Sequence, residues 1–353
     1  MAKKVEIAHF LCPSCGGSLV AVPKALRCQQ CGYERERITQ KIEPTLKPLY
    51  QVEVNREEKL FECPNCGAKT ESDSVSLLCP YCLTPLVGEF FNPLLPFGVG
   101  KIWVDPKQVV GLLKTHIRSL WFAPNAFIEG YRKATSPKAF YYPVWSFDAN
   151  VRIAYSGWRG VRRTRMVYIG GRSQTRTRME WQPVSGVVDL HIEDIQQLGY
   201  PPIDASMKRL HWSRRGLEAL HKEALSGWES KEYSVTPMEA REAAQPLFDA
   251  KIEWAIRRDI GGDAQRIDRY ESDYLSQKFL YFLAPFYHIQ IHWKDKRYDF
   301  FVDAQSGKVV GERPYSWIKI AIFILFILAG VAGLYFLDQW MRTHHHISLI
   351  DLL

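Results

Sequence analysis

Eight cysteines lie within the first 82 residues of the 353-residue chain, and their spacing suits a metal ion. They form two sets that share the pattern C-x2-C-x12-C-x2-C, the second set 51 positions after the first. Each C-x2-C pair places two thiolates on one side of a tight turn, and two pairs complete a closed tetrahedral zinc site. The predicted ligands are Cys12, Cys15, Cys28 and Cys31 in one site and Cys63, Cys66, Cys79 and Cys82 in the other. We therefore expect two structural Zn²⁺ ions per chain.

Two other uses of the cysteines fit this pattern less well. Four disulfides would suit a secreted domain, but the chain begins MAKKVEIAHF, which is not a secretory signal, and C-x2-C pairs favour metal. A redox C-x-x-C belongs to a single thioredoxin-like unit, whereas this array holds four pairs. Gly16, Gly32 and Gly67 follow the second cysteine of three pairs, where a turn toward the sulfurs needs glycine, and Leu83 breaks that pattern in the fourth.

Residues 320–337 form 18 consecutive positions without a charge or a strongly polar group. At about 1.5 Å per residue they cover about 27 Å, enough for the hydrocarbon core of a bilayer. Tyr315 and Trp317 on one side and Trp340 on the other suit the two membrane interfaces. We expect one transmembrane helix within 315–340.

Charge and redox chemistry both orient this span. Basic residues are more frequent just before the span than just after it, which favours a cytoplasmic location for the N-terminal side. Thiolates that hold zinc stay reduced in the cytoplasm, which favours the same orientation in the cytoplasmic (inner) membrane. A short tail, 341–353, is then expected outside, and its histidines, His344–His346, are interpreted as a polar tail.

Basic side chains gather in one stretch, although the whole chain has a net charge of +8. The first 100 residues hold equal numbers of acidic and basic side chains, which favours protein docking over DNA binding for the ribbons. The excess of positive charge lies mainly between residues 151 and 182, where many arginines are opposed by a single acidic residue, Glu180. The candidate anion-binding residues are Arg159, Arg162, Arg163, Arg165, Arg172, Arg176 and Arg178.

This stretch has the pattern of a hairpin around Gly170 and Gly171, and three interpretations of it stay open. It is a solvated hairpin without a ligand, or it contacts the phosphates of nucleic acid, or it contacts those of lipid headgroups. A membrane-tethered domain lies beside anionic lipids, and each nearby arginine contributes about 1 kcal/mol of attraction. Anionic lipid is therefore at least as well supported as nucleic acid.

The segment between the ribbons and the span has both helical and strand patterns and predicts an α+β domain. Asp105-Pro106 and Thr236-Pro237 are helix starts, the second with a capping box. Two further helices are expected, one over 207–225 and one from Asp263 toward Lys278. Aromatic-rich alternation predicts strands over 140–156, and further strands are expected from Phe282 onward.

Motifs for the common enzyme chemistries are missing from the sequence. The stretch closest to a phosphate-binding loop, 98–102, lacks the first glycine and has Ile102 where Mg²⁺ needs a hydroxyl. The sequence also lacks H-E-x-x-H and G-x-S-x-G. We therefore expect a protein that is not an enzyme.

The stretches CPNCG, FNPLLPFGV, LWFAPNAF, YYPVWSFDANVRIAYSGWRG, DIGGDAQRI and VDAQSGKVVGERPYSWIKI run through most of the chain, from Cys63 to Lys319. In these stretches the chain resembles a family of bacterial single-pass membrane proteins with TFIIB-type zinc ribbons, often labelled primosomal helicase-like. The resemblance implies a scaffold that recruits SPFH-domain or PspA-type envelope-stress proteins to the membrane. The helicase label has no counterpart here because the nucleotide-binding motifs are missing, and this chain has two ribbons where some relatives have one.

These observations predict a membrane-anchored adaptor with an α+β fold. The expected parts are a first zinc ribbon (1–40), a linker and second ribbon (41–90), an α+β cytoplasmic domain (91–314), a transmembrane helix (315–340) and a tail (341–353). The favoured function is docking of protein partners at the cytoplasmic membrane face. The alternative is a membrane-tethered nucleic-acid-binding protein that uses the hairpin between Arg159 and Arg178.

Overall fold

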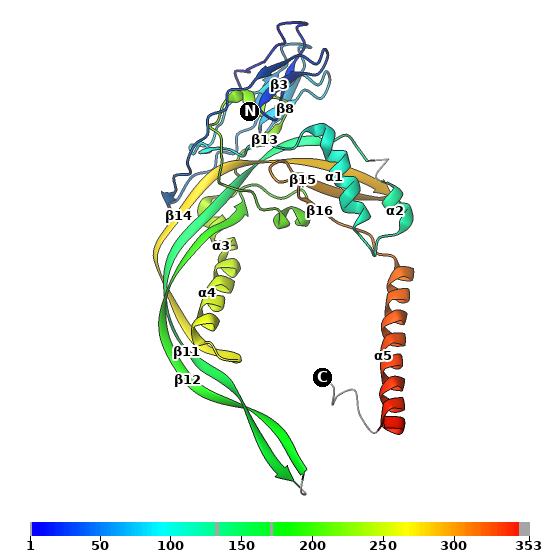
Figure 1. Ribbon diagram of the computed structural model, residues 1–353. Coiled ribbons are helices and arrows are strands. Elements are labelled where there is room, and N and C mark those ends of the chain that lie inside the picture. Colours follow the sequence, from blue (N-terminus) through cyan, green and yellow to red (C-terminus); the bar gives the residue numbers. More distant parts are fainter. Residues whose placement is uncertain (1, 131–133, 170–171, 346–353) are drawn as a thin grey trace.

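In a computed structural model of the chain, one long sheet connects the cysteine-bearing end of the molecule to a curved arch of strands. The structure describes residues 2–130, 134–169 and 172–345. The cysteine groups lie at one end of the molecule, and the arch and the C-terminal helix extend from the other side (Figure 1). The predicted α+β class, with two four-cysteine groups and one apolar C-terminal helix, is confirmed.

The strands near the cysteines are short hairpins in three sheets. One three-stranded sheet contains β2 (Leu19–Val22), β3 (Ala25–Cys28) and β4 (Glu34–Glu36), and another contains β1 (Lys3–Lys4), β6 (Lys59–Glu62) and β7 (Lys69–Ser72). The third sheet has ten strands and includes the hairpin of β8 (Ser74–Leu78) and β9 (Pro85–Val87). The second cysteine group is therefore split between a small sheet and the main sheet.

The ten-stranded sheet runs in the order β16-β15-β14-β11-β13-β8-β9, with β12 beside β11 and with β5 and β10 beside β14. Its remaining strands are β5 (Lys47–Pro48), β10 (Gly98–Val99), β11 (Lys138–Ile169), β12 (Arg172–Leu198), β13 (Glu229–Lys231), β14 (Ala264–Trp293), β15 (Lys296–Asp303) and β16 (Val309–Gly311). The sheet thus contains strands from both sides of residue 90, the expected boundary between the second ribbon and the α+β domain. These two regions therefore share one hydrogen-bonded framework.

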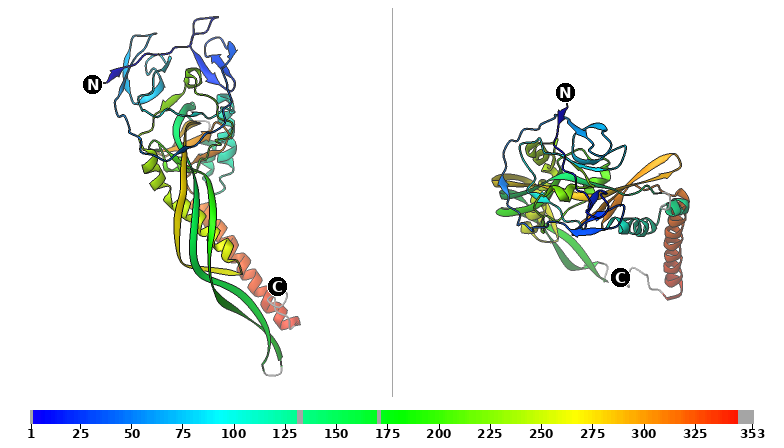
Figure 2. Two further views of the ribbon diagram at one scale, coloured as in Figure 1. Left: turned by 90° about the vertical axis from the view of Figure 1, so that its left-hand side faces the viewer. Right: turned by 90° about the horizontal axis from the view of Figure 1, so that it is seen from above.

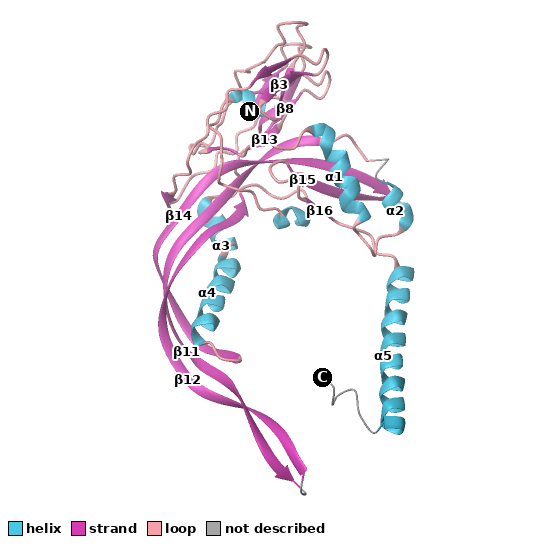
Figure 3. Ribbon diagram, in the orientation of Figure 1, coloured by secondary structure: helices cyan, strands magenta, loops and turns pink. Residues whose placement is uncertain are grey.

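Three of these strands form the arch. The antiparallel pairing of β11 with β14 extends from Lys138↔His288 to Gly160↔Ala264, and β12 pairs along the other edge of β11. Beyond Gly160 only β11 and β12 continue, as a two-stranded hairpin (Figure 3). The alternation predicted over 140–156 is present from Asn150 onward, because Val151 and Ile153 are buried while Arg152 between them is exposed. Residues 140–149 are instead buried on both faces of the sheet.

Helix α4 (Gln245–Ile260) covers the concave side of the arch (Figure 3). It buries Ile252, Ile256 and Ile260 against the strands, at a spacing that places them on one helical face. The Tyr155 hydroxyl donates a hydrogen bond of 2.6 Å to Asp259 and joins helix to strand. The arch is therefore two layers thick along α4 and a single layer beyond it.

Both predicted helix starts are confirmed. Helix α1 (Pro106–Arg118) begins with the Asp105 cap and Pro106 in its first turn, and α3 (Pro237–Ala243) begins with a Thr236 capping box. In the described parts of the chain the other helices are α2 (Asn125–Glu129), α5 (Trp317–His345) and the 3-10 helices η2 (Ala205–Arg209) and η3 (Lys222–Leu225).

Two predicted helices are wrong. Residues 207–225 form loops with only η2 and η3 at their ends. The segment from Asp263 toward Lys278 is the first half of β14, because its pairing with β11 overrides the local cap signal of Asp263. The side chain of Asp263 instead accepts a hydrogen bond of 2.7 Å from the main-chain amide of Arg162.

Helix α5 carries the predicted span, over Trp317–Trp340, and none of the span is buried against the rest of the described chain. Its first turns touch the α1–α2 corner, where Phe122 and Phe323 pack edge to face at 5.4 Å and Lys319 donates to the Ala123 carbonyl at 2.7 Å. Both α5 and the β11–β12 hairpin extend away from the cysteine end in the same general direction (Figures 1 and 2).

Candidate metal centres and the arginine hairpin

The first four predicted ligands converge on one point. Cys12 and Cys15 lie in the turn before β2, whereas Cys28 ends β3 and Cys31 lies in the turn that follows. The sulfur atoms of Cys12 and Cys31 are 3.6 Å apart, those of Cys15 and Cys28 are 3.5 Å apart, and all four lie within 4.8 Å of one another. A tetrahedral site with metal–sulfur bonds of about 2.3 Å has sulfur–sulfur edges of about 3.8 Å, so this group fits a metal ion.

The second group has the same geometry. The sulfur atoms of Cys63 and Cys82 are 3.5 Å apart, those of Cys66 and Cys79 are 3.7 Å apart, and all four again lie within 4.8 Å. Cys63 follows β6 and Cys79 follows β8, so the main sheet holds one half of this site. The two four-cysteine sites could therefore hold two structural metals.

The turns that carry the ligands need a left-handed backbone. Gly16, Gly32 and Gly67 have φ between 72° and 75°, a region that glycine adopts without strain. Leu83 has φ of 60° at the equivalent place, and the residue is 62% exposed. A non-glycine residue held there costs of order 1–3 kcal/mol, and such strain is concentrated at functional sites.

One thiol in each group loses its proton readily. The main-chain amide of Cys31 lowers the pKa of the Cys28 thiol to about 6. The hydroxyl and main chain of Thr84 lower the pKa of Cys82 to about 6. The pKa of Cys15 is raised to about 12, because neighbouring thiols outweigh a main-chain amide that lowers it. A metal ion would replace the protons that the thiols otherwise share.

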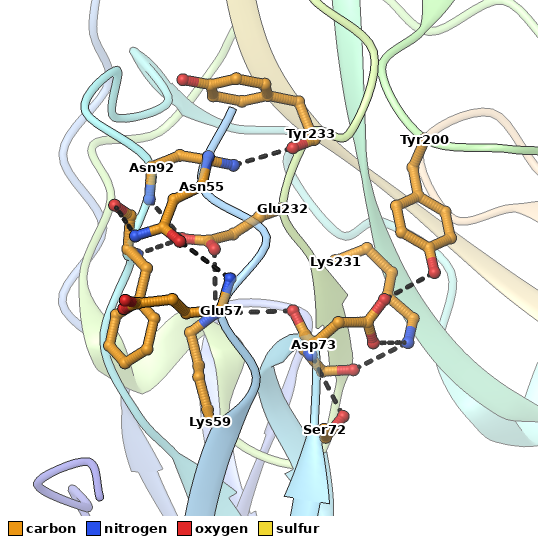
Figure 4. A network of polar contacts seen from close by, with 12 residues as sticks. Asn55, Glu57, Lys59, Ser72, Asp73, Asn92, Tyr200, Lys231, Glu232 and Tyr233 are labelled. Atoms are coloured by element: carbon orange, nitrogen blue, oxygen red, sulfur yellow. Dashed lines mark hydrogen bonds and ion pairs between the residues drawn. The ribbon is translucent and has the colours of Figure 1, made fainter. Parts of the chain in front are cut away.

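A buried ion pair fixes the second cysteine group to the main sheet (Figure 4). The Lys59 ammonium lies 2.9 Å from a Glu232 carboxylate oxygen, and the two side chains are 1% and 7% exposed. Glu232 also accepts hydrogen bonds from the main-chain amides of Phe91 and Asn92. The charge on Lys59 is thus neutralised by a carboxylate whose other oxygen is also hydrogen-bonded, as a buried charge requires.

A second polar cluster lies beside this pair (Figure 4). Asp73 accepts hydrogen bonds from the Lys231 ammonium at 2.8 Å and from the Tyr200 hydroxyl at 2.6 Å. Burial alone would raise the pKa of Asp73, but these two donors lower it below its usual value. Together the two clusters join the segment between Lys59 and Asp73 to Tyr200 and to Lys231–Glu232, which are distant from it in sequence.

The first cysteine group is attached in the same way. The Trp228 indole donates to the Ala21 carbonyl at 3.0 Å, and the Arg37 guanidinium lies 2.7 Å from Glu218, with both charged side chains buried. Sequence reasoning missed these ion pairs because their partners are 181 and 173 residues apart, and no local pattern marks them. Buried polar contacts therefore attach both cysteine groups to the segments that build the main sheet.

The structure brings four of the seven predicted arginines onto one face of the hairpin. Arg163 lies opposite Arg178 and Arg165 lies opposite Arg176 in the antiparallel register. Opposed residues share a face, and like charges in direct opposition destabilise a hairpin. Glu180 lies 3.2 Å from Arg163, and the side chains of this quartet are exposed.

The other three predicted arginines are placed differently. Arg159 donates to the Ile260 carbonyl at the end of α4 and is a structural residue. Arg162 pairs with Met179, on the opposite face from the quartet. Arg172 begins β12, and its side chain lies outside the described residues, as do the side chains of His344 and His345 and all of His346.

No family model matches this chain, and no curated protein or solved structure matches it. Its class therefore rests on its own geometry. Two four-cysteine groups and one exposed apolar helix fit a membrane-anchored metal-binding protein.

Proposed function

We propose that this protein is an adaptor anchored in the cytoplasmic membrane that displays two zinc ribbons to a protein partner. Four thiolates without an open position are the ligand set of structural zinc, which supports Zn²⁺ as the metal. Such sites keep their thiolates in a reducing compartment, which supports a cytoplasmic location for the ribbons. The resemblance in sequence to TFIIB-type zinc-ribbon membrane proteins points to SPFH-domain or PspA-type partners.

One observation carries the docking proposal. The last knuckle of the second ribbon exposes Tyr81 and Leu83, with 75% and 62% of their surface accessible. Leu83 holds a left-handed conformation where the other three knuckles use glycine, so this leucine costs stability in the free protein. The ribbons also lie at the end of the molecule remote from α5 (Figure 1), where a partner could reach them. We propose that Tyr81 and Leu83 form the docking contact.

The test separates folding from docking. Leu83→Gly relieves the backbone strain and should raise stability by about 1 kcal/mol while metal content stays the same. The same variant should lose co-purification of an SPFH-domain or PspA-type protein from membranes. Leu11→Ser, at an exposed position of the first ribbon, is the matched control and should keep the partner. Full partner recovery with Leu83→Gly combined with Tyr81→Ser would contradict the proposal.

A second candidate function rests on the way arginines are paired across the β11–β12 hairpin. Arg163 has Glu180 beside it, but Arg165 and Arg176 lie in direct opposition and have no carboxylate partner among the described residues. Such opposition costs stability, which supports contact with a polyanion, either nucleic acid or anionic lipid. Binding of DNA that weakens steeply with salt, and that is lost in Arg165→Gln combined with Arg176→Gln, would support a nucleic-acid role. Salt-insensitive or absent DNA binding would leave the adaptor role as the function.

A further inference from the structure

A polar cavity lies where several segments of the sheet and its loops meet. Its volume is about 830 Å³, and it is lined by the segment after the first ribbon, by β12 at Glu193 and Asp194, by His211 and residues 213–216, and by the turn between β15 and β16. This volume lies within the range of small-molecule sites. Asp194 has φ of 54°, a left-handed conformation that aspartate adopts more readily than most residues, and it lines the cavity.

The acidic side chains of the cavity are already in use within its wall. Glu218 pairs with the buried Arg37 at 2.7 Å. Asp194 accepts hydrogen bonds from two neighbouring side chains, and Asp303 accepts them from the main chain of its own turn. Glu193 lies 3.0 Å from the His191 ring, which makes a charge pair only when that histidine is protonated, and its side chain is 56% exposed. Glu218, Asp194 and Asp303 therefore have partners within the protein, whereas Glu193 faces solvent.

Most basic side chains of the cavity lack the partners that its acidic side chains have. Among the described residues, the side chains of Lys41, Lys101 and Arg215 have no hydrogen-bond or carboxylate partner, and the Lys101 ammonium lies 3.9 Å over the Trp103 ring. Arg214 is the exception, because it makes a two-point contact with Asp148. Three cationic groups thus keep all their N–H donors free, and oxygen-rich anions are the ligands that such donors recognise.

One unused acceptor completes the site. The Oε1 atom of Gln305 is buried and has no hydrogen-bond partner, although Gln305 lines the cavity. A buried acceptor without a partner costs about 1–3 kcal/mol, and a ligand that donates an O–H or N–H would satisfy it. We infer that this cavity binds a small phosphate-bearing molecule, with the phosphate held by Lys41, Lys101 and Arg215 and a hydroxyl or amine of the ligand donating to Gln305.

The experiment is calorimetric titration of the full-length protein in detergent micelles with pyrophosphate and with glycerol 3-phosphate. The expected result is saturable binding to one site, weakened at least about tenfold by Lys101→Gln and by Arg215→Gln, because each removes charge-assisted hydrogen bonds. Lys251→Gln on α4 is the matched control and should bind as the wild type does. Thermal unfolding of each variant shows that it remains folded.

Further arms separate this site from the hairpin and from lipid. Arg165→Gln combined with Arg176→Gln should leave the titration unchanged, and loss of binding in that variant would overturn the proposal. So would unchanged affinity in the cavity variants or no saturable binding of any probe. Binding to phosphatidic acid vesicles alone, lost in Lys101→Gln, would support the site and identify a lipid headgroup as its phosphate.

Discussion

At the residue scale, the cysteine thiolates set how the four-cysteine sites respond to acid. In the metal-free fold the pKa of Cys28 and of Cys82 is lowered to about 6, below their ordinary value of 9.0. The stability that these two thiolates contribute without metal is therefore complete above pH 9.0 and is lost as the pH falls from there through about 6. A bound metal competes with protons for the same sulfur atoms and keeps them deprotonated to still lower pH. We expect metal to be retained at neutral pH and released on acidification below about pH 6, measured with a chromogenic zinc chelator, and release already at pH near 8 would contradict thiolate ligation.

The buried Lys59–Glu232 pair gives a second residue-scale prediction. Lys59→Met leaves Glu232 charged and buried, so we expect a loss of about 3–5 kcal/mol in the free energy of unfolding. Lys4→Met is the matched control, because the Lys4–Glu62 pair belongs to the same small sheet but is 69% and 41% exposed. That control should cost less than about 1 kcal/mol. Equal losses in chemical denaturation would show that burial of the pair is unimportant.

Single residues differ in how far the sequence could assign them. The eight cysteines could be assigned because C-x2-C spacing fixes which side of a turn each sulfur occupies. Lys59 could not, because in a four-residue strand it looks like any exposed lysine and its partner is 173 positions away. The cost of Leu83 was visible only as a broken glycine pattern, and its left-handed φ of 60° needed the structure.

At the element scale, the β11–β12 hairpin carries charges that oppose its own stability. Arg176→Glu places a carboxylate opposite Arg165, and we expect it to stabilise the hairpin by about 0.2–1 kcal/mol because repulsion becomes attraction. Hydrogen exchange of the amides between Gly160 and Ile169 measures this change. Arg162→Glu on the other face is the control and should have a smaller effect. If Arg176→Glu accelerates exchange instead, the arginines are not in repulsive opposition.

Elements were predictable where local chemistry decides them. Helices α1 and α3 follow from their caps, and the span follows from its unbroken apolar run. The first half of β14 was not predictable in this way, because a Gly-Gly-Asp start imitates a helix cap while pairing with β11 decides the outcome. Residues 207–225 were also predicted to be a helix, but their apolar side chains pack in a core while the main chain forms loops without a regular α-helix.

At the scale of the whole molecule, the hairpin and α5 impose a geometric conflict in a membrane. In both side views the described end of the β11–β12 hairpin lies at least as far from the ribbons as the C-terminal end of α5 (Figures 1 and 2). A bilayer crossed by α5 in this orientation would therefore contain part of the hairpin, whose open edges would leave main-chain N–H and C=O groups unpaired in hydrocarbon. We therefore expect α5 to turn about residues 312–316 when it enters the membrane.

An environment-sensitive fluorophore at Tyr168, an exposed position near the hairpin tip, tests this expectation in lipid vesicles. Its emission should report water and should be quenched by iodide added on the ribbon side. The same fluorophore at Phe326, within α5, should report hydrocarbon and be protected from iodide. Protection of both positions would show that α5 keeps the orientation of the free structure.

If both four-cysteine sites hold metal on a protein anchored in a membrane, metal analysis of the full-length chain, extracted from membranes under reducing conditions, should find two zinc ions per chain. Cys28→Ser combined with Cys31→Ser removes ligands from the first site only and should reduce the content to one. Recovery of the chain from the soluble fraction, or a membrane-bound chain with less than one zinc, would contradict this interpretation.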